Sequence, residues 1–231
     1  MRIVSFNTQH CAVHPTGRID LPEFARYVSS LGADAIGLNE IRGEGPEPGY
    51  SAQTEALSSL SGMSEHFFAP AIHVNGSPYG NAMLSRDAIV SAENIAIPDP
   101  EARSYDGYYE SRCLIKARLE CGLTLLITHF GLNPDERECA VRTVLEHIED
   151  ERCVLMGDFN MEPDDPLLAP IRARMRDTAE ASDSELLSFP SDAPRVTIDY
   201  MFVSSDITVK SVSMPCDVVS DHLPYVVDIE L

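Results

Sequence analysis

Amide, acidic and histidine side chains stand at the boundaries of several apolar segments of the sequence. The residues that directly follow or precede these predicted strands are Asn7, Glu40, His129, Asp158, Asn160, Asp221 and His222. A further acid, Asp199, interrupts an apolar stretch between Ile198 and Tyr200, where a carboxylate needs a buried partner. Strand ends and the loops after them commonly present catalytic groups. We therefore treat these residues as one candidate site.

The residue types in this set are those that hold a hard metal ion and handle phosphate. Asn7, Glu40 and Asp221 offer oxygen donors, which Mg²⁺ prefers and which also suit Mn²⁺. No group of cysteines and histidines has the spacing of a zinc site. Histidines beside carboxylates suit phosphate recognition and proton transfer. Together these features indicate hydrolysis of a phosphate ester by an activated water.

Strands and helices alternate along the chain, and no linker separates two domains. Apolar alternation and β-branched residues predict strands at 2–7, 35–38, 81–86, 89–97, 112–119, 123–130, 153–156, 197–204 and 225–231. Helical periodicity predicts helices at 20–31, with Asp20 as N-cap, and at 51–61, 134–150 and 165–176. Loops are expected at 43–50, 98–111 and 177–195. This order favours two packed sheets with helices outside, a layered α/β sandwich formed by residues 1–231 as a single domain.

The charge balance argues against polyanionic partners. The 231 residues include 37 acidic residues and 17 Lys or Arg, a net charge of −20. Such a chain repels nucleic acid and anionic membranes at long range, although a few arginines near a cleft could offset this locally. The sequence has no apolar run of membrane-spanning length, no signal-like start and no CxxC pair among its six cysteines. We expect a cytoplasmic protein with free thiols and no membrane partner, whose oligomeric state stays open.

The motifs also occur in a familiar order. They are Arg2–Asn7, Ile36–Glu40, Tyr79–Arg86, Thr128–Phe130, Gly157–Asn160, Ile198–Val203 and Ser220–Pro224. In this order the sequence resembles the endonuclease/exonuclease/phosphatase superfamily, and the resemblance spans nearly the whole chain. It implies the DNase I-like fold, a four-layer α/β/β/α sandwich. Thr8, Gln9 and Phe130 depart from the usual pattern, but none of them replaces a catalytic group.

The resemblance implies roles for the residues of the metal side. Asn7 and Glu40 match the N-terminal metal site, with Glu40 as the principal Mg²⁺ ligand, and Asp221 matches a further metal-side carboxylate. Asp158 matches the aspartate that orients or deprotonates the attacking water. Asn160 matches its partner, which contacts phosphate and can help to hold the metal.

It also implies roles on the phosphate side. His222 matches the histidine that hydrogen-bonds a phosphoryl oxygen, and Asp199 the aspartate that pairs with it. His129 matches a phosphate-contacting histidine. Asn81 and Arg112 match less distinctive positions near the phosphate pocket, where they are expected to bind substrate.

Three functions stay open at this point. The favoured function is metal-dependent hydrolysis of a small phosphate mono- or diester, because the net charge disfavours nucleic acid without excluding it. The alternative is an endo- or exonuclease that acts on DNA or RNA with the same site. A binding protein that has lost activity is disfavoured, because every expected catalytic residue is present. Single residues also have ordinary structural explanations, such as a turn cap at Asn7 or an Asx turn at Asp158 and Asn160.

Overall fold

The computed structural model describes the whole chain, residues 1–231. Its strands are β1 (Arg2–Asn7), β2 (Ala12–Val13), β3 (Arg18–Ile19), β4 (Ala35–Arg42), β5 (Glu65–Val74), β6 (Ser77–Ser85), β7 (Ile89–Ile97), β8 (Arg112–Leu119), β9 (Thr124–His129), β10 (Cys153–Asp158), β11 (Arg176–Asp177), β12 (Asp199–Val203), β13 (Thr208–Ser213) and β14 (Tyr225–Glu230). Its α-helices are α1 (Leu21–Ser30), α2 (Gln53–Ser61), α3 (Pro134–His147) and α4 (Ala169–Arg172), and its 3₁₀ turns are η1 (Gln9–Cys11), η2 (Pro166–Leu168) and η3 (Thr178–Ala181).

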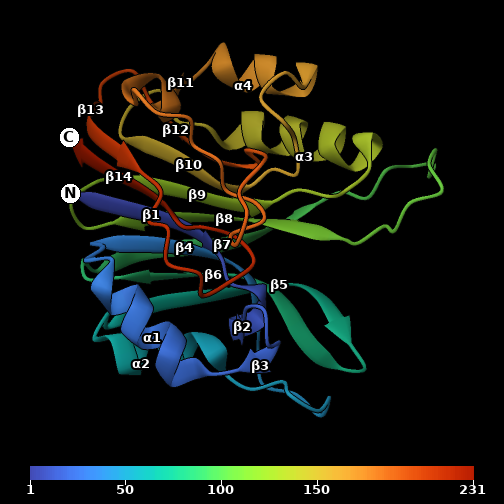
Figure 1. Ribbon diagram of the computed structural model, residues 1–231. Coiled ribbons are helices and arrows are strands. Elements are labelled where there is room, and N and C mark those ends of the chain that lie inside the picture. Colours follow the sequence, from blue (N-terminus) through green and yellow to red (C-terminus); the bar gives the residue numbers. More distant parts are fainter.

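The long strands form two six-stranded sheets that pack face to face (Figure 1). The strand order is β13-β14-β1-β4-β6-β5 in the first sheet and β11-β12-β10-β9-β8-β7 in the second. Helices α1 and α2 cover the outer face of the first sheet, and α3 and α4 cover that of the second (Figure 1). The four-layer α/β/β/α sandwich that the sequence predicts is therefore confirmed.

Three apolar clusters fill the three interfaces between these layers. The central cluster lies between the sheets and includes the fully buried Ile3, Ile127 and Met156. At Gly37 the sheets come so close that a Cβ atom would lie 3.0 Å from both Ile127 and Met156. Because Gly37 has no side chain, the two sheets can pack this closely. Each sheet supplies part of the candidate site.

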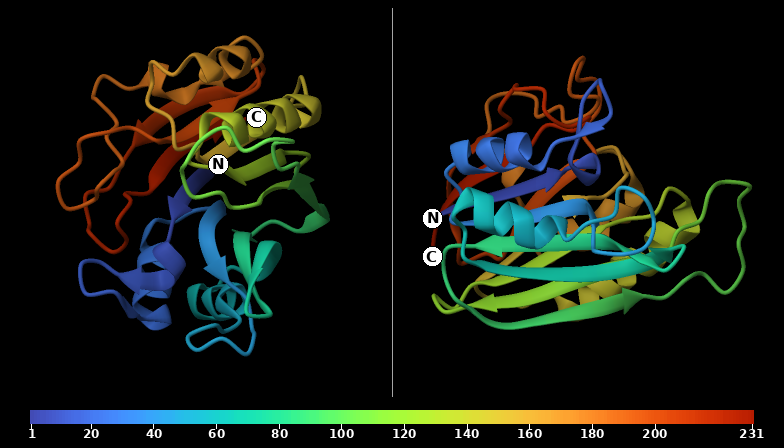
Figure 2. Two further views of the ribbon diagram at one scale, coloured as in Figure 1. Left: turned by 90° about the vertical axis from the view of Figure 1, so that its right-hand side faces the viewer. Right: turned by 90° about the horizontal axis from the view of Figure 1, so that it is seen from below.

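Each sheet contains one parallel pair of strands, β1–β4 in the first and β9–β10 in the second. The carboxyl ends of a parallel pair meet at the same edge of the sheet. Asn7 and Asn39 are paired at that edge of the first sheet, and His129 and Asp158 at that edge of the second. Both edges lie at the right-hand side of Figure 1 and face the viewer in the left-hand view of Figure 2.

Local side chains set the start of two helices. The Asp20 side chain accepts a hydrogen bond of 2.9 Å from the backbone N–H of Glu23, which confirms Asp20 as the N-cap of α1. At α3 the Asn133 and Glu136 side chains form a capping box, in which Glu136 accepts a 3.1 Å bond from the Asn133 N–H. That helix ends at His147, three residues before the predicted end.

Five strands were not predicted: the two-residue strands β2, β3 and β11, and two longer strands, β5 and β13, which are the edges of the first sheet. Strand β5 carries Pro70, where its register with β6 shifts, and β13 alternates exposed with half-buried residues. Edge strands pair on one side only and tolerate proline, so they lack the apolar run that reveals a central strand.

Other boundaries also differ from the prediction. Strand 35–38 continues to Arg42, and strand 81–86 begins at Ser77. The helix predicted at 165–176 is wrong in extent, because only a 3₁₀ turn and a single helical turn form between Pro166 and Arg172. The loop predicted at 177–195 contains the short turn η3.

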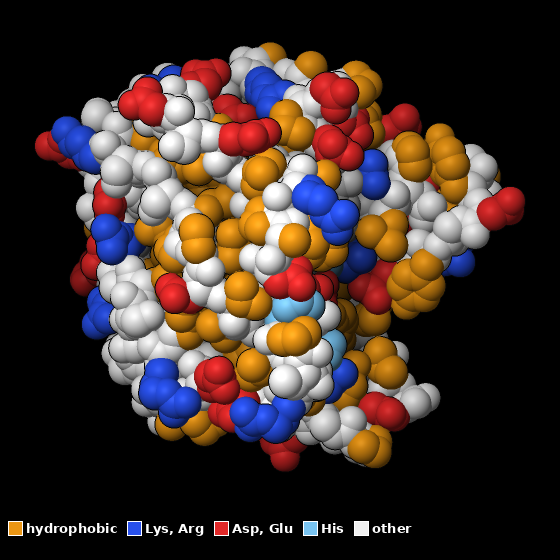
Figure 3. Space-filling model, in the orientation of Figure 1, with side chains coloured by type: hydrophobic (Ala, Val, Ile, Leu, Met, Phe, Trp, Pro, Cys, Tyr) orange, Lys and Arg blue, Asp and Glu red, His pale blue; other side chains and the backbone are white.

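The predicted loop at 98–111 connects β7 to β8 and stands out from the body of the molecule (Figure 2). Its base is tied to the start of α3. The Asn133 amide donates a 2.8 Å bond to the carbonyl of Tyr108, and the Glu110 N–H donates a 3.0 Å bond to Glu136. The space-filling surface is indented beside this segment, and a histidine is visible near the indentation (Figure 3). None of the helices combines the length and hydrophobicity that crossing a bilayer requires.

Candidate active site

Three candidate residues form a row across the second sheet. The register pairs Asp158 on β10 with His129 on β9 and with Asp199 on β12. Residues paired in this way lie on the same face of a sheet. His129 and Asp158 end their strands, whereas Asp199 begins the antiparallel strand β12, so all three lie at the same edge of the sheet, where the apolar layer between the sheets ends.

The first sheet presents a matching row of amides on β1, β4 and β6. These residues are Asn7, Asn39 and Asn81, all of them buried. The Asn7 amide nitrogen donates a 3.0 Å bond to Oδ2 of Asp158. The oxygen of Asn39 accepts a 3.1 Å bond from the N–H of Asp158, and its nitrogen donates a 2.9 Å bond to the Thr128 carbonyl. The two rows therefore meet at Asp158.

Asn39 was not singled out by the sequence analysis, although it lies inside a quoted motif. A signal for it exists in the alternation of β4, because Ala35, Gly37 and Asn39 occupy every second position. Asn81 supports this amide: its oxygen accepts a 2.8 Å bond from Asn39, and its nitrogen donates a 3.1 Å bond to the Cys113 carbonyl. Since both polar groups of Asn81 have protein partners, the geometry favours a supporting role over the predicted contact with substrate.

Glu40 reaches the site through an irregular backbone. Its φ of +60° lies in the left-handed region, and the register between β4 and β6 shifts between Leu38 and Ile41. One carboxylate oxygen accepts a 3.1 Å bond from the Asn7 amide, and the other accepts a 2.9 Å bond from the Tyr79 hydroxyl. Tyr79 is a further residue that the sequence analysis did not assign, because only the fold places its hydroxyl beside Glu40.

His222 and Asp199 form a close pair in the site. His222 Nδ1 lies 2.8 Å from Asp199 Oδ2, and His222 Nε2 lies 3.7 Å from Asp158 Oδ2. Burial opposes the charged ring, but the hydrogen bond and charge of Asp199 outweigh it and raise the pKa of His222 to about 10. The Phe189 ring packs on the imidazole with 4.8 Å between centroids. The predicted pairing is present, and it favours the protonated form of His222.

Asp158 is buried at the centre of the two rows. Burial, together with the charge of Asp199, raises the pKa of its carboxyl to about 7. Its Oδ1 accepts a 2.9 Å bond from the N–H of Asn160, so the Asx turn considered for these two residues exists alongside the site. The Asn160 amide also lies 3.2 Å from His129 and donates a 3.0 Å bond to the Phe130 carbonyl.

His129 lies between the row of the second sheet and Arg112. Its Nδ1 is 3.2 Å from an Arg112 guanidinium nitrogen, and its Nε2 is 3.5 Å from Asp158 Oδ2. Burial, Arg112 and His222 hold the pKa of His129 well below its ordinary value. Arg112 in turn forms a 2.8 Å ion pair with Glu110, a residue that the sequence analysis did not assign.

Asp221 is the one predicted metal residue without a contact to Asn7 or Glu40. Its side chain accepts a 3.2 Å bond from the Ser220 hydroxyl, and its charge raises the pKa of the neighbouring His222. The structure therefore brings Asp221 beside the histidine end of the site and does not join it to Glu40.

The donor set fits a hard divalent cation. Glu40 forms no ion pair with Lys, Arg or His, and its carboxylate partners are neutral donors. Asp158 and Asp199 lie with His222 in a buried cluster whose ligand atoms are all within 4.8 Å of one another. Oxygen donors with excess negative charge suit Mg²⁺ or Mn²⁺. Asn7 supplies its nitrogen to Glu40 while its oxygen accepts a 3.1 Å bond from the Gln9 N–H, so here it orients Glu40.

A comparison with protein families shows to which family the chain belongs. The sequence matches the Endonuclease/Exonuclease/phosphatase family over residues 4–222. The chain belongs to the endonuclease/exonuclease/phosphatase family. Members of this family are phosphoester hydrolases and generally use a divalent metal. The family resemblance inferred from the sequence is thus confirmed, and the fold is the one described above.

Solved structures of this family share the fold at low sequence identity. An endonuclease/exonuclease/phosphatase from Beutenbergia cavernae DSM 12333 superposes with a TM-score of 0.81 at 22% identity, covering 100% of this chain and 71% of that one. A mannosyl-6-phosphatase from Bacteroides thetaiotaomicron gives 0.77 at 17% identity, with 100% of both chains covered. The Neisseria 3' phosphatase NExo, bound to a product DNA hairpin, gives 0.72 at 15% identity and again covers 100% of both chains. A search among curated proteins found no match.

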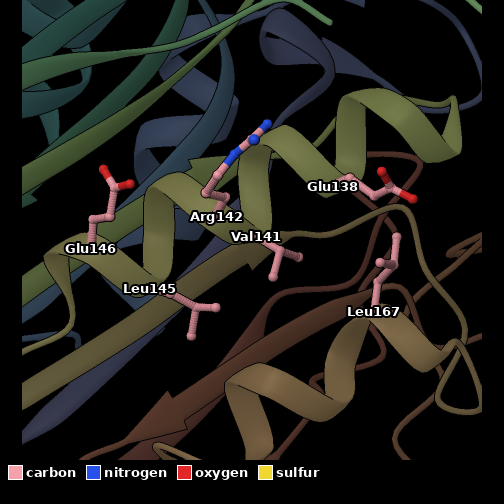
Figure 4. A pocket seen from close by; sticks show the side chains of 6 residues that line it. All are labelled: Glu138, Val141, Arg142, Leu145, Glu146 and Leu167. Carbon is pink, nitrogen blue, oxygen red and sulfur yellow. The ribbon is translucent and has the colours of Figure 1, made fainter.

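One further surface groove lies away from these residues. It runs between α3 and the turn η2 and is lined by Glu138, Val141, Arg142, Leu145, Glu146 and Leu167 (Figure 4). None of the predicted site residues lines it. The groove is therefore separate from the candidate active site.

Proposed function

We propose that the protein is a metal-dependent phosphohydrolase that cleaves a phosphate mono- or diester of a small molecule by in-line attack of an activated water. One observation carries this proposal: Asp158 lies where the two polar rows meet, within 3.7 Å of His222 and hydrogen-bonded to Asn7. Asp158 as a buried base, His222 as a cation for phosphate and Glu40 as a carboxylate for a metal could thereby act on one phosphate group.

Asp158 is the proposed base for water. Its Oδ1 is held by the N–H of Asn160 at 2.9 Å, so the orientation of the carboxylate is fixed. A carboxyl with its pKa raised to about 7 can accept a proton from water near neutral pH better than an ordinary aspartate can. We assign Asp158 to orienting and deprotonating the attacking water.

His222 is the proposed cationic group for the phosphoryl oxygens. Asp199 keeps the ring protonated and fixes its orientation through the 2.8 Å contact with Nδ1. Its Nε2–H then points to the space beside Asp158, where negative charge develops during attack on phosphorus. Asn160 and His129 are proposed to hydrogen-bond the same phosphoryl group.

Glu40 is the proposed principal metal ligand, oriented by Asn7 and Tyr79. When bound, Mg²⁺ or Mn²⁺ would neutralise charge on the phosphate and lower the pKa of a coordinated water. Asp221, which lies beside the histidine end of the site, is proposed to favour the charged form of His222. The hydrogen bonds to both oxygens of Glu40 hold the carboxylate ready for a cation.

The rim of the site supports a small substrate. The projecting segment 98–111 carries three exposed acids, Asp99, Glu101 and Asp106, and one arginine, Arg103, whereas its fourth acid, Glu110, is paired with Arg112. A rim of this charge repels a polyanion at short range as well as at long range. The alternative is a nuclease with the same site, because the Neisseria 3' phosphatase, bound to a product DNA hairpin, shows that a protein of this fold can accommodate DNA.

A substrate panel tests the proposal. Phosphate release or diester cleavage would be measured with Mg²⁺ and with EDTA on sugar phosphates, nucleotides, inositol phosphates, a phosphodiester reporter and plasmid DNA. We expect turnover of at least one small ester that EDTA abolishes, with the plasmid left intact. Nicking of the plasmid without turnover of any small ester would establish the nuclease instead, and the local cleft would then outweigh the acidic rim.

A further inference from the structure

The two histidines of the site face partners of opposite charge. His222 Nδ1 contacts the carboxylate of Asp199 at 2.8 Å, whereas His129 Nδ1 contacts the guanidinium of Arg112 at 3.2 Å. A guanidinium only donates hydrogen bonds, and a neutral imidazole has one donor and one acceptor nitrogen. The lone pair of His129 must therefore lie on Nδ1, and its proton on Nε2.

A second donor competes for the same ring. The Asn160 amide nitrogen lies 3.2 Å from His129 Nε2 and uses one of its two N–H groups for a 3.0 Å bond to the Phe130 carbonyl, so its other N–H is the competing donor. Arg112 carries a charge and is the stronger donor. A proton on Nε2 also faces the carboxylate of Asp158 at 3.5 Å, which stabilises it. A proton on Nδ1 would instead face the guanidinium N–H, with two donors in contact.

Arg112 is itself fixed in place. Its guanidinium forms a 2.8 Å ion pair with Glu110, and the side chains of Arg112 and Glu110 are only 11% and 14% exposed. Glu110 is tied through its N–H to Glu136 at the start of α3, and the Tyr108 hydroxyl donates a 3.2 Å bond to its carboxylate. The guanidinium has little freedom to leave His129, so the contact persists.

We propose that Arg112 is a positioning residue that holds His129 as the neutral tautomer protonated on Nε2, with Glu110 fixing Arg112. The use of this tautomer rests on the proposed function: His129 then donates a hydrogen bond to a phosphoryl oxygen and keeps its proton, while His222 supplies the positive charge. Both Nε2–H groups lie beside Asp158 Oδ2, at 3.5 and 3.7 Å. This role differs from the direct substrate contact that the sequence suggests for Arg112.

Nitrogen NMR of the histidine rings tests the proposal in the unmodified protein. Long-range proton–nitrogen correlations at pH 7 distinguish a neutral ring protonated on Nε2, one protonated on Nδ1, and a cation. The His129→Gln variant identifies the signals of His129 by their loss. We expect the Nε2–H pattern for His129 and the cationic pattern for His222. An Nδ1–H or cationic pattern for His129 would overturn the proposal, whether or not the protein hydrolyses phosphate esters.

Substitutions then show whether Arg112 is the cause. Arg112→Met removes the donor, and we expect the Nε2–H pattern to be lost and kcat to fall about 10- to 100-fold with a smaller change in KM. Arg112→Lys restores a hydrogen-bond donor and should recover part of the Nε2–H pattern and part of kcat. Arg103→Gln is the matched control, because that arginine lies on the same projecting segment and packs on the Tyr109 ring. An unchanged His129 pattern in a folded Arg112→Met protein would contradict the proposal.

Failure of this inference is separable from failure of the proposed function. The NMR pattern needs neither metal nor substrate. A protein that shows the expected pattern but hydrolyses no phosphate ester would contradict the proposed function alone. A protein that hydrolyses esters with His129 protonated on Nδ1 would contradict the role of Arg112 alone.

Discussion

The charge of each ionisable side chain in the site follows from the partner placed against it. Asp199 raises the pKa of His222 to about 10 against the effect of burial. Burial and the guanidinium of Arg112 lower the pKa of His129. Burial and Asp199 raise the pKa of Asp158 to about 7. The two histidines of the site therefore have different pKa values and can take different roles. In hydrolases, such differences in environment distinguish the group that acts as an acid from the group that acts as a base.

His10 gives a prediction about stability at this scale. Burial, with a smaller effect of Arg42, lowers its pKa from 6.5 to about 4. Between these values the unfolded chain binds a proton that the folded chain does not, so stability falls as pH decreases from 6.5 to 4. His10→Asn removes this effect and suits the left-handed backbone at φ +47°. Relative to the wild type, its free energy of unfolding should rise by roughly 1–2 kcal/mol across that window, the half-buried ring being partly screened.

Denaturant unfolding at several pH values, from about 4.5 to about 7.5, measures this difference across the window in which the histidine titrates. His66→Asn is the control for loss of a histidine, because His66 is exposed on β5. A constant difference between His10→Asn and the wild type over the whole range would show that His10 titrates alike in the folded and unfolded chain.

The sequence could predict the residues whose chemistry is specialised. Acids and histidines at strand ends have few other uses when several occur together, so Glu40, Asp158 and His222 could be singled out as candidates. Asn39 and Tyr79 were not, because an asparagine or tyrosine in a strand has many ordinary explanations. Their meaning depends on what the opposite sheet or the neighbouring strand places against them, and that is fixed only by the tertiary structure.

Register is the element-scale property that assembles the site. Asp158 is paired with His129 on one side and Asp199 on the other, so a shift of one residue in either pair would turn a side chain of the candidate site to the opposite face. Central strands such as β9 and β10 could be predicted from their continuous apolar runs. The edge strands β5 and β13 could not, since their outer sides face solvent.

Gly157 fixes this register, which leads to a prediction for β10. It has φ +146°, and a Cβ atom there would lie 1.8 Å from the Thr128 carbonyl oxygen on β9. Gly157→Ala therefore requires the two central strands to separate just before Asp158. We expect a loss of more than about 4 kcal/mol in the free energy of unfolding, measured by denaturant titration.

Gly62→Ala is the matched control for the positive φ. Gly62 ends α2 with φ +76°, and a Cβ atom there would meet no other atom within 4 Å, so its substitution should cost only about 1 kcal/mol. Equal costs at the two glycines would mean that the approach of β9 to β10 does not constrain the strand.

At the scale of the whole molecule, the fold brings two half-sites together. The first sheet supplies Asn7, Asn39 and Glu40, and the second supplies His129 and Asp158. The layered architecture could be predicted from the alternation of strands and helices and from the family resemblance. That the polar row of one sheet lies opposite the polar row of the other could not be predicted, because this depends on how closely the two sheets pack. The net charge of −20 and the acidic projecting segment favour a small substrate over a polyanion.

The most direct test of this account compares Asp158→Asn with the wild type. Release of phosphate from the best small ester of the panel would be measured with Mg²⁺ and with EDTA, and thermal unfolding would verify that the variant is folded. The account predicts metal-dependent release by the wild type and a kcat at least about 10³-fold lower in the folded variant, because the water loses its base. Release by Asp158→Asn close to the wild-type rate would contradict the assignment of this site as the centre of hydrolysis.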